Sequence, residues 1–153
     1  MPAAPRISEL TDHLGYWFRA VSNHVSQAFA AKLAVRGVTV AEWVMMRALY
    51  GKDPMSPSRL AGDMAMTRGA ITKLADRLIE KNLVVRQANS QDARAQTLAL
   101  TVQGTSLVPS LAKLADGNDR EFFGHLTDAE RKALERLLKR MVERFVMNAV
   151  PTE

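Results

Sequence analysis

The sequence contains no cysteine and no long hydrophobic run. Without cysteine the chain cannot form a disulfide framework, a thiolate nucleophile, a Cys-ligated zinc site or a thiol redox switch, and a reducing cytoplasm suits it best. The longest apolar runs, such as Trp43-Val44-Met45-Met46, are four residues long, and no apolar segment resembling a secretion signal follows Met1-Pro2-Ala3-Ala4-Pro5. We therefore expect a cytoplasmic protein with neither a membrane span nor a signal peptide.

What is present is the composition of an ordinary globular protein. The 153 residues are 47% hydrophobic and 24% charged, which is enough for one domain spanning 1–153 with a sizeable core. Lys and Arg number 21 against 16 Asp and Glu, so the formal net charge is +5. This basic excess favours a polyanionic partner.

Helical periodicity dominates the N-terminal part of the chain. Ser8 is a candidate N-cap, and Arg36 and Gly37 form a typical closing turn. Between them, apolar residues recur at the spacing of one helical face: Leu10, Leu14, Phe18, Val21, Val25 and Phe29. The pattern predicts a helix over 8–37, which would be about 43 Å long at 1.5 Å per residue.

Three capped helices are predicted next. Thr39-Val40-Ala41-Glu42 has the capping-box pattern and begins a buried helix that reaches Tyr50. Ser56-Pro57 opens a short helix through Leu60, Ala61 and Met64, and Thr67 caps a fourth helix. The apolar face of this fourth helix consists of Ala70, Ile71, Leu74 and Leu78. Its other face carries Arg68, Gly69, Thr72, Lys73, Asp76 and Arg77.

The pattern then changes to that of a β-hairpin. Residues 83–86 and 95–100 read as two short strands around the polar turn 89–94. Thr101 can cap a fifth helix, which we expect Pro109 to kink or to delay. Thr127-Asp128-Ala129-Glu130 is a further capping signal before a last amphipathic helix. Its apolar residues are Leu134, Leu137, Leu138, Met141, Val142 and Phe145.

This order of elements predicts a mainly α (α+β) winged helix-turn-helix fold. The reading head would occupy 39–100, and the helices over 8–37 and 101–148 would flank it. These flanking helices have more apolar surface than a small winged helix can cover, so we expect them to form a homodimer. A monomer that folds them onto its own core remains the alternative.

Four segments resemble successive motifs of the MarR family of bacterial transcriptional regulators. They are Met55-Ser-Pro-Ser-Arg-Leu-Ala61, the run from Thr67 to Val84, Asp92-Ala-Arg94, and Leu100-Thr-Val-Gln-Gly104. The resemblance covers nearly the whole chain, with one departure: Asn82 stands where the family usually has glycine. Asparagine also tolerates the left-handed conformation, so this departure changes little.

The placement of the fourth helix assigns its exposed residues to DNA. A recognition helix contacts bases through its N-terminal turns, where Thr67, Arg68, Gly69, Thr72 and Lys73 would project. Gly69 permits close approach, and Arg68 can pair with a guanine edge. Lys73 and Arg77 are equally suited to neutralising phosphates. The alternative for all of these residues is an ordinary solvated helix face.

Residues in two further segments, outside that helix, are predicted to contact DNA. The family resemblance implies that Arg94 reaches into the minor groove and that Asp92 holds the loop or the arginine in place. An Asx-type turn beside an exposed arginine is the alternative. Ser56 and Ser58 could contact a phosphate at the start of the third helix, although ordinary capping explains Ser56 equally well.

A candidate effector site lies on the first helix. His13, Trp17, Ala20 and His24 form a stripe at helical spacing, and Trp43 and Met46 are candidates to lie near it. The resemblance implies a small aromatic or phenolic anion as the ligand, whereas the ordinary interpretation of such a stripe is core. His13 and His24 are about 16 Å apart along one helix, too far to share a metal ion.

No enzymatic motif is present in the sequence. We find no Gly-rich phosphate loop, nucleophile elbow, metal-ligand spacing or paired carboxylates, and we expect no catalytic residue, metal or cofactor. The prediction is a homodimeric, sequence-specific regulator of the MarR type, a repressor of an inverted-repeat operator that is released by an effector. The alternative is a winged-helix protein-interaction module. The eight basic and five acidic residues of 52–94 favour DNA.

Overall fold

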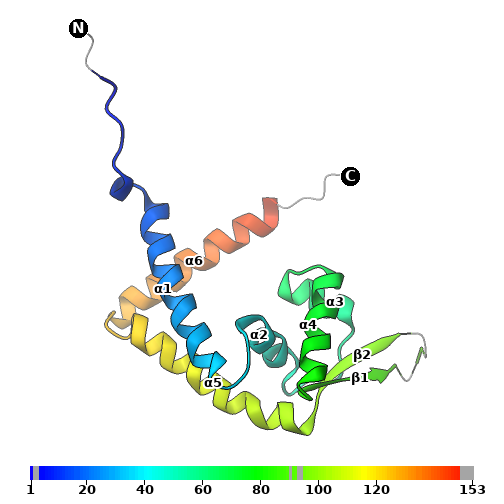
Figure 1. Cartoon of the computed structure of the whole chain (residues 1–153). Coiled ribbons are helices and arrows are strands. Elements are labelled where there is room, and N and C mark those ends of the chain that lie inside the picture. Colours follow the sequence, from blue (N-terminus) through cyan, green and yellow to red (C-terminus); the bar gives the residue numbers. More distant parts are fainter. Residues whose placement is uncertain (2–3, 90, 93–94, 149–153) are drawn as a thin grey trace. The chain divides into compact units, whose positions relative to one another are not determined.

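The computed structural model describes residues 1, 4–89, 91–92 and 95–148, with the side chains of 146–148 left aside. Its element order is a 3-10 turn η1 (Leu10–Asp12), then α1 (Leu14–Ala34), α2 (Val40–Leu49), α3 (Pro57–Met64), α4 (Arg68–Glu80), β1 (Val84–Ala88), β2 (Gln96–Leu100), α5 (Val102–Phe123) and α6 (Asp128–Asn148). Figure 1 shows these elements along the chain. The chain divides into two compact units, residues 1–116 and 117–153.

The first unit is a winged helix, as predicted. Helix α4 contacts α2, α3 and β1, and the hairpin β1–β2 follows it directly (Figure 1). The two strands pair antiparallel, with Val84 opposite Leu100 and Ala88 opposite Gln96. Met55 adds an isolated bridge to Leu98, which ties the segment before α3 to the hairpin. The mainly helical fold class predicted from the sequence is therefore confirmed.

The core of this unit lies between α2, α3, α4 and the hairpin. Its fully buried side chains come from all of these elements and from α1 and α5: Leu33, Met45, Met46, Leu60, Ile71, Leu78, Val84, Leu98, Val108 and Leu111. On α4 the buried positions are Ile71, Leu74, Ala75 and Leu78, while Ala70 is half-buried. The apolar face of α4 is thus turned inward, and its opposite face remains in solvent.

Hydroxyl caps begin most of these helices. The side chains of Thr39, Ser56 and Thr67 accept hydrogen bonds from the third backbone N–H of α2, α3 and α4, at 3.1–3.2 Å. Thr101 Oγ1 accepts from the Gly104 N–H at 3.0 Å in the same way. Each cap satisfies a donor that has no partner inside its helix, so these predicted starts are confirmed.

The predicted start of the first helix is wrong. Ser8 does not cap a helix; instead Glu9 is the N-cap of the separate 3-10 turn η1. The Glu9 backbone N–H donates to Asp12 Oδ2 at 2.8 Å, which closes this turn. His13 is then extended, with φ −95° and ψ 126°, so α1 begins only at Leu14. At its other end α1 stops at Ala34, so Arg36 lies beyond the last turn, while Gly37 adopts the left-handed conformation as expected.

Two other sequence expectations need correction. Helix α5 begins at Val102 and runs through Pro109, so the proline does not delay its start. The strands are β1 at Val84–Ala88 and β2 at Gln96–Leu100, so the first one continues two residues beyond the predicted end at Arg86. Asn82 takes a left-handed φ of 58°, in agreement with its expected tolerance of that conformation.

The second unit contains the end of α5 and all of α6. Thr127 and Glu130 form a complete capping box: the Thr127 N–H donates to Glu130 Oε1 at 3.0 Å, and the Glu130 N–H donates to Thr127 Oγ1 at 3.1 Å. The hydrogen bond from the Thr127 backbone lowers the pKa of Glu130 below its ordinary value. Along α6, Leu137, Met141, Val142 and Phe145 are exposed. The last helix is thus amphipathic, with an apolar face open to solvent.

Candidate nucleic-acid interface

The exposed face of α4 gathers most of the predicted DNA-binding residues. Thr67 caps the helix, and Arg68, Gly69, Thr72, Lys73 and Arg77 are all exposed on it. They lie opposite the buried Ile71, Leu74 and Leu78, so the folded core holds the helix while the first two turns remain accessible. Base-contacting side chains of a recognition helix project from those N-terminal turns.

Gly69 leaves the start of α4 bare of side-chain bulk. A Cβ atom added there would meet nothing within 4 Å, so no packing inside the protein requires glycine at this position. The positive end of the helix dipole therefore lies at an exposed turn that no bulky side chain covers at Gly69, although Thr67 already occupies the Ala70 N–H. Thr72 Oγ1 donates to the Arg68 carbonyl at 3.0 Å, which fixes its side chain against the helix backbone.

Ion pairing leaves the face of α4 positively charged. Asp76 on α4 pairs with Arg86 on β1, so this carboxylate is neutralised by the wing. In the part of the chain that the structure describes, no carboxylate lies within ion-pair distance of Arg68, Lys73 or Arg77. These three cations are available to neutralise phosphates or to contact bases.

The other predicted DNA contacts lie at the edges of this face. Ser56 is the N-cap of α3, where its Oγ accepts from the Arg59 N–H at 3.2 Å, and Ser58 is exposed in the first turn of α3. Asp92 is exposed in the loop between the strands. Arg94 lies outside the described residues, so its predicted reach into the minor groove stays a prediction.

The predicted effector residues separate into exposed and buried groups. His13 is the N-cap of α1, and His24 and Trp17 are exposed on that helix. The indole Nε1 of Trp17 donates to the Thr11 carbonyl at 2.9 Å, and its ring lies edge-on to Tyr16. Trp43 is half-buried against the core, and Met46 is completely buried in it. The stripe on α1 is thus accessible, whereas Met46 belongs to the core.

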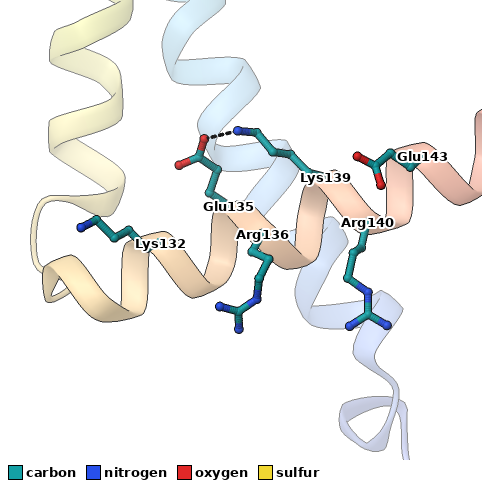
Figure 2. A pocket seen from close by; sticks show the side chains of 6 residues that line it. All are labelled: Lys132, Glu135, Arg136, Lys139, Arg140 and Glu143. Carbon is teal, nitrogen blue, oxygen red and sulfur yellow. Dashed lines mark hydrogen bonds and ion pairs between the residues drawn. The ribbon is translucent and has the colours of Figure 1, made fainter.

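A polar surface on α6 is lined by Lys132, Glu135, Arg136, Lys139, Arg140 and Glu143 (Figure 2). Lys139 Nζ donates to Glu135 Oε1 at 2.6 Å, and this bond lowers the pKa of Glu135 and raises that of Lys139. The guanidinium groups of Arg136 and Arg140 point away from this pair. All six residues belong to one helix, and we assign no ligand to this surface.

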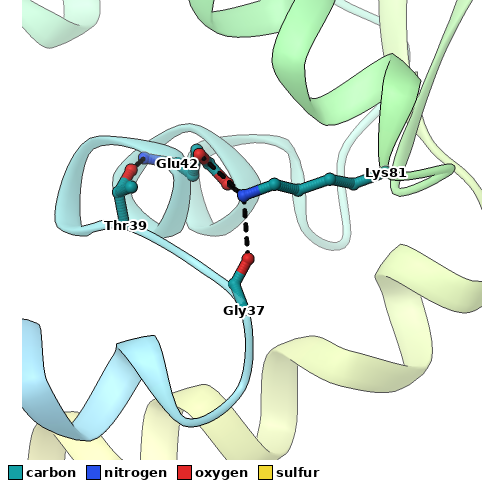
Figure 3. A network of polar contacts seen from close by, with 4 residues as sticks. All are labelled: Gly37, Thr39, Glu42 and Lys81. Atoms are coloured by element: carbon teal, nitrogen blue, oxygen red, sulfur yellow. Dashed lines mark hydrogen bonds and ion pairs between the residues drawn. The ribbon is translucent and has the colours of Figure 1, made fainter.

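Sequence reasoning missed the contact that anchors the end of α4. Lys81, the C-cap of α4, bonds the buried carboxylate of Glu42 (Figure 3). The two residues are 39 positions apart, so no local pattern pairs them. The one available signal is an acidic residue in a helix whose only other charged residue is Arg47. Among the described residues, no group of three His, Asp or Glu side chains could hold a metal ion, and no helix is long and apolar enough to cross a membrane.

Comparisons with known proteins agree with this geometry. Residues 38–95 match the model of the MarR family. A transcriptional regulatory protein for the hcr operon of Thauera aromatica is 30% identical over 146 residues, covering 92% of this chain and 88% of the relative.

Solved structures share the fold over most of the chain. A mutant of MarR from Escherichia coli in complex with operator DNA is 25% identical, with a TM-score of 0.78 over 88% of this chain and 99% of that one. Bordetella bronchiseptica BpsR, whose DNA binding is regulated by 6-hydroxynicotinic acid, has a TM-score of 0.80 at 23% identity, over 90% of this chain and 98% of that one.

Proposed function

The chain belongs to the MarR family of transcriptional regulators, and we propose that it is a homodimeric repressor of an inverted-repeat operator. The observation that carries this proposal is the exposed N-terminal half of α4, with Arg68, Lys73 and Arg77 free of carboxylate partners within the described chain. Its likeness to a MarR protein solved with operator DNA supports the same role for α4. The regulator would work in the cytoplasm without a catalytic step of its own.

The reading head would occupy 39–100 and the dimerisation helices 8–37 and 101–148. Leu14 is 86% exposed on α1 and Phe145 is 68% exposed on α6, and Phe18, Val21, Met141 and Val142 are exposed beside them. Apolar faces of this size mark protein interfaces, and a two-fold dimer would cover both helices symmetrically. It would present two copies of α4 to half-sites about one DNA turn apart, ~34–36 Å.

Dimerisation is tested by placing charge on the apolar face of α6. We expect Phe145→Asp to sediment as a monomer at concentrations where the wild type is a dimer, because an aspartate would be buried without a partner in the interface. Lys132→Asp, on the charged face of the same helix, is the control and should leave the dimer intact. A dimer of unchanged strength in Phe145→Asp would contradict the assignment of α6.

DNA reading is tested with duplexes that the wild-type protein selects from a randomised pool. Arg68→Ala should weaken binding by about 5- to 150-fold and relax base preference at one position of each half-site. Lys73→Ala should weaken binding to all sequences alike and reduce the slope of log affinity against log salt by about 1. Lys132→Ala removes the same charge from α6 and should have no effect. Unchanged affinity in Arg68→Ala and Arg94→Ala would contradict the site.

We also propose that a small aromatic or phenolic anion releases the protein from DNA. The exposed Trp17 offers a stacking surface on α1, and His13 at the N-cap of α1 and His24 on the helix offer hydrogen-bond donors. A suitable probe is 6-hydroxynicotinic acid, the compound to which BpsR responds. We expect it to quench tryptophan fluorescence in the wild type and in Trp43→Phe, but not in Trp17→Phe. Equal quenching in both variants would contradict this location.

A further inference from the structure

A charged clamp joins the end of α4 to the corner between α1 and α2. Lys81 Nζ donates to Glu42 Oε2 at 2.7 Å, to Glu42 Oε1 at 3.0 Å and to the Gly37 carbonyl at 2.8 Å (Figure 3). Glu42 is 1% exposed, while the side chain of Lys81 is 38% exposed. Three bonds thus hold one ammonium group against a buried carboxylate and a backbone carbonyl.

The three residues of the clamp come from different parts of the fold. Gly37 takes a left-handed φ of 72° in the turn that follows α1, and Glu42 lies in the first turn of α2. Lys81 is the C-cap that follows Glu80, the last residue of α4, and β1 begins three residues later at Val84. The clamp therefore connects the turn that follows α1, the helix proposed to form the dimer, with the end of α4, the helix proposed to read DNA.

The chain just after Lys81 is also held firmly. Asn82 is left-handed, its carbonyl accepts from Thr101 Oγ1 at 2.8 Å, and the Leu83 N–H donates to the Leu78 carbonyl at 2.9 Å. The C-terminal end of α4 is therefore anchored by polar contacts to the α1–α2 corner and to the start of α5. Its N-terminal end, which carries Arg68, is exposed.

Polar contacts hold α4 at its C-terminal end, so a rotation of the helix about that end displaces its N-terminal turns. Its 13 residues span about 20 Å at 1.5 Å per residue. A change of direction of about 10° at Lys81 would move the first turn by about 3 Å, close to the rise of one base pair. The apolar contacts of Ile71, Leu74 and Leu78 hold α4 to the core but are non-directional, whereas three charged hydrogen bonds define a direction.

We propose that Lys81 is a positioning residue for DNA binding, which through Glu42 and Gly37 sets the half-site spacing that the dimer accepts. This inference rests on the proposed function, a dimer that reads an inverted repeat. Lys81 itself would not contact the bases. Its role is to hold α4 in a constant direction relative to α1, so that two reading heads stay at one separation.

If the clamp only stabilised the fold, removing it would change stability and would leave the preference for half-site spacing unchanged. Buried ion pairs contribute little net stability, because the cost of desolvating both charges offsets their attraction, and their replacement by apolar residues of similar size is often neutral. Removing one partner alone is harmful because it leaves an unpaired buried charge. The variant Lys81→Met/Glu42→Met therefore removes the clamp while retaining the volume and avoiding that penalty.

The experiment measures affinity for three kinds of duplex. The first is the inverted repeat selected by the wild type, the second carries two additional base pairs between its half-sites, and the third contains one half-site only. Two base pairs change the separation by about 7 Å and the rotation by about 70°. The matched control, Lys139→Met/Glu135→Met, removes an exposed ion pair from α6. Sedimentation establishes that each variant is a dimer.

We expect the wild type and the control to bind the selected spacing about tenfold or more tightly than the altered one. Lys81→Met/Glu42→Met should discriminate by less than about threefold, with its affinity for the single half-site within about twofold of wild type. A folded dimeric variant that keeps the wild-type discrimination would overturn the proposal. So would an equal loss of affinity on all three duplexes, which would indicate general damage to the reading head.

Two further outcomes are a double variant that does not fold and a wild type that selects no inverted repeat. If the double variant does not fold, Glu42→Gln decides the question, because it replaces one of the two carboxylate oxygens that accept from Lys81 by an NH2 donor and removes the negative charge. Weakened spacing discrimination in Glu42→Gln would support the proposal, and wild-type discrimination would overturn it. If the wild type itself selects no inverted repeat, the proposed function fails and the positioning role fails with it.

Discussion

Gly104 in the first turn of α5 provides a sharp test of how the wing packs against the start of α5. An ideal Cβ atom at Gly104 would lie 2.1 Å from the Leu83 carbonyl oxygen and 3.3 Å from Leu100 Cδ2. Ordinary C···O contacts are about 3.3 Å, so an alanine would have to move α5 away from the wing by about 1 Å. The Leu83 carbonyl also accepts from the Thr101 N–H at 3.1 Å, and this bond would be disrupted.

The magnitude follows from these contacts. Overpacking in a filled site costs about 1–3 kcal/mol, and the lost backbone hydrogen bond costs about 1 kcal/mol. Replacing a helical glycine by alanine gains about 1 kcal/mol of helix propensity. Gly104→Ala should therefore lower the free energy of unfolding by about 1–3 kcal/mol, although the same change in an open helix would raise it.

Gly117 is the matched control in the same helix. A Cβ atom there would contact only Arg120 Nη2, at 3.9 Å, so Gly117→Ala should raise the free energy of unfolding by about 1 kcal/mol. The assay is urea denaturation followed by circular dichroism at one protein concentration, because dimerisation makes stability concentration-dependent. A Gly104→Ala protein as stable as the wild type would refute the close approach of α5 to the wing.

Three further predictions concern the helix starts and the binding face. Gly69→Ala should stabilise the protein by up to about 1 kcal/mol but weaken DNA binding, as measured by urea denaturation and fluorescence anisotropy; unchanged affinity would argue against close backbone approach. Thr67→Ala should destabilise the protein by about 1 kcal/mol through loss of the α4 cap, whereas Thr67→Ser should not. NMR titration should place the pKa of Glu130 below that of a free glutamate. The capping box then stabilises the fold fully at pH above the ordinary glutamate pKa, and this stabilisation is lost as the pH falls through the lowered pKa. An ordinary pKa for Glu130 would contradict the hydrogen bond from Thr127.

The parts of the fold that were predictable from sequence depend on neighbours along the chain. Caps at Thr39, Ser56 and Thr67 join a hydroxyl to an N–H three residues later, so spacing alone reveals them. The exposed and buried faces of α4 follow from helical periodicity in the same way. Element order then distinguishes a winged helix from other helical folds, because the hairpin follows directly after a capped helix.

Other features depend on competition or on distant partners. Ser8 has the residue type of an N-cap, but the Glu9 N–H donates to Asp12 Oδ2 and closes a separate 3-10 turn before α1. The partner of Glu42 was not predictable, because the capping-box pattern points to Thr39 while the folded chain brings Lys81 to the carboxylate. Such contacts between residues far apart in sequence exist only after α2 and α4 pack together.

The proposed function requires that a dimer of this chain reads an inverted repeat through the first turns of α4. It is tested most directly by selecting bound fragments from a randomised DNA pool at about 0.15 M salt, where non-specific binding is weakened and specific contacts persist. We expect enrichment of an inverted repeat whose half-sites lie one DNA turn apart, ~34–36 Å. A folded dimer that enriches no sequence would contradict it and favour a protein-interaction module.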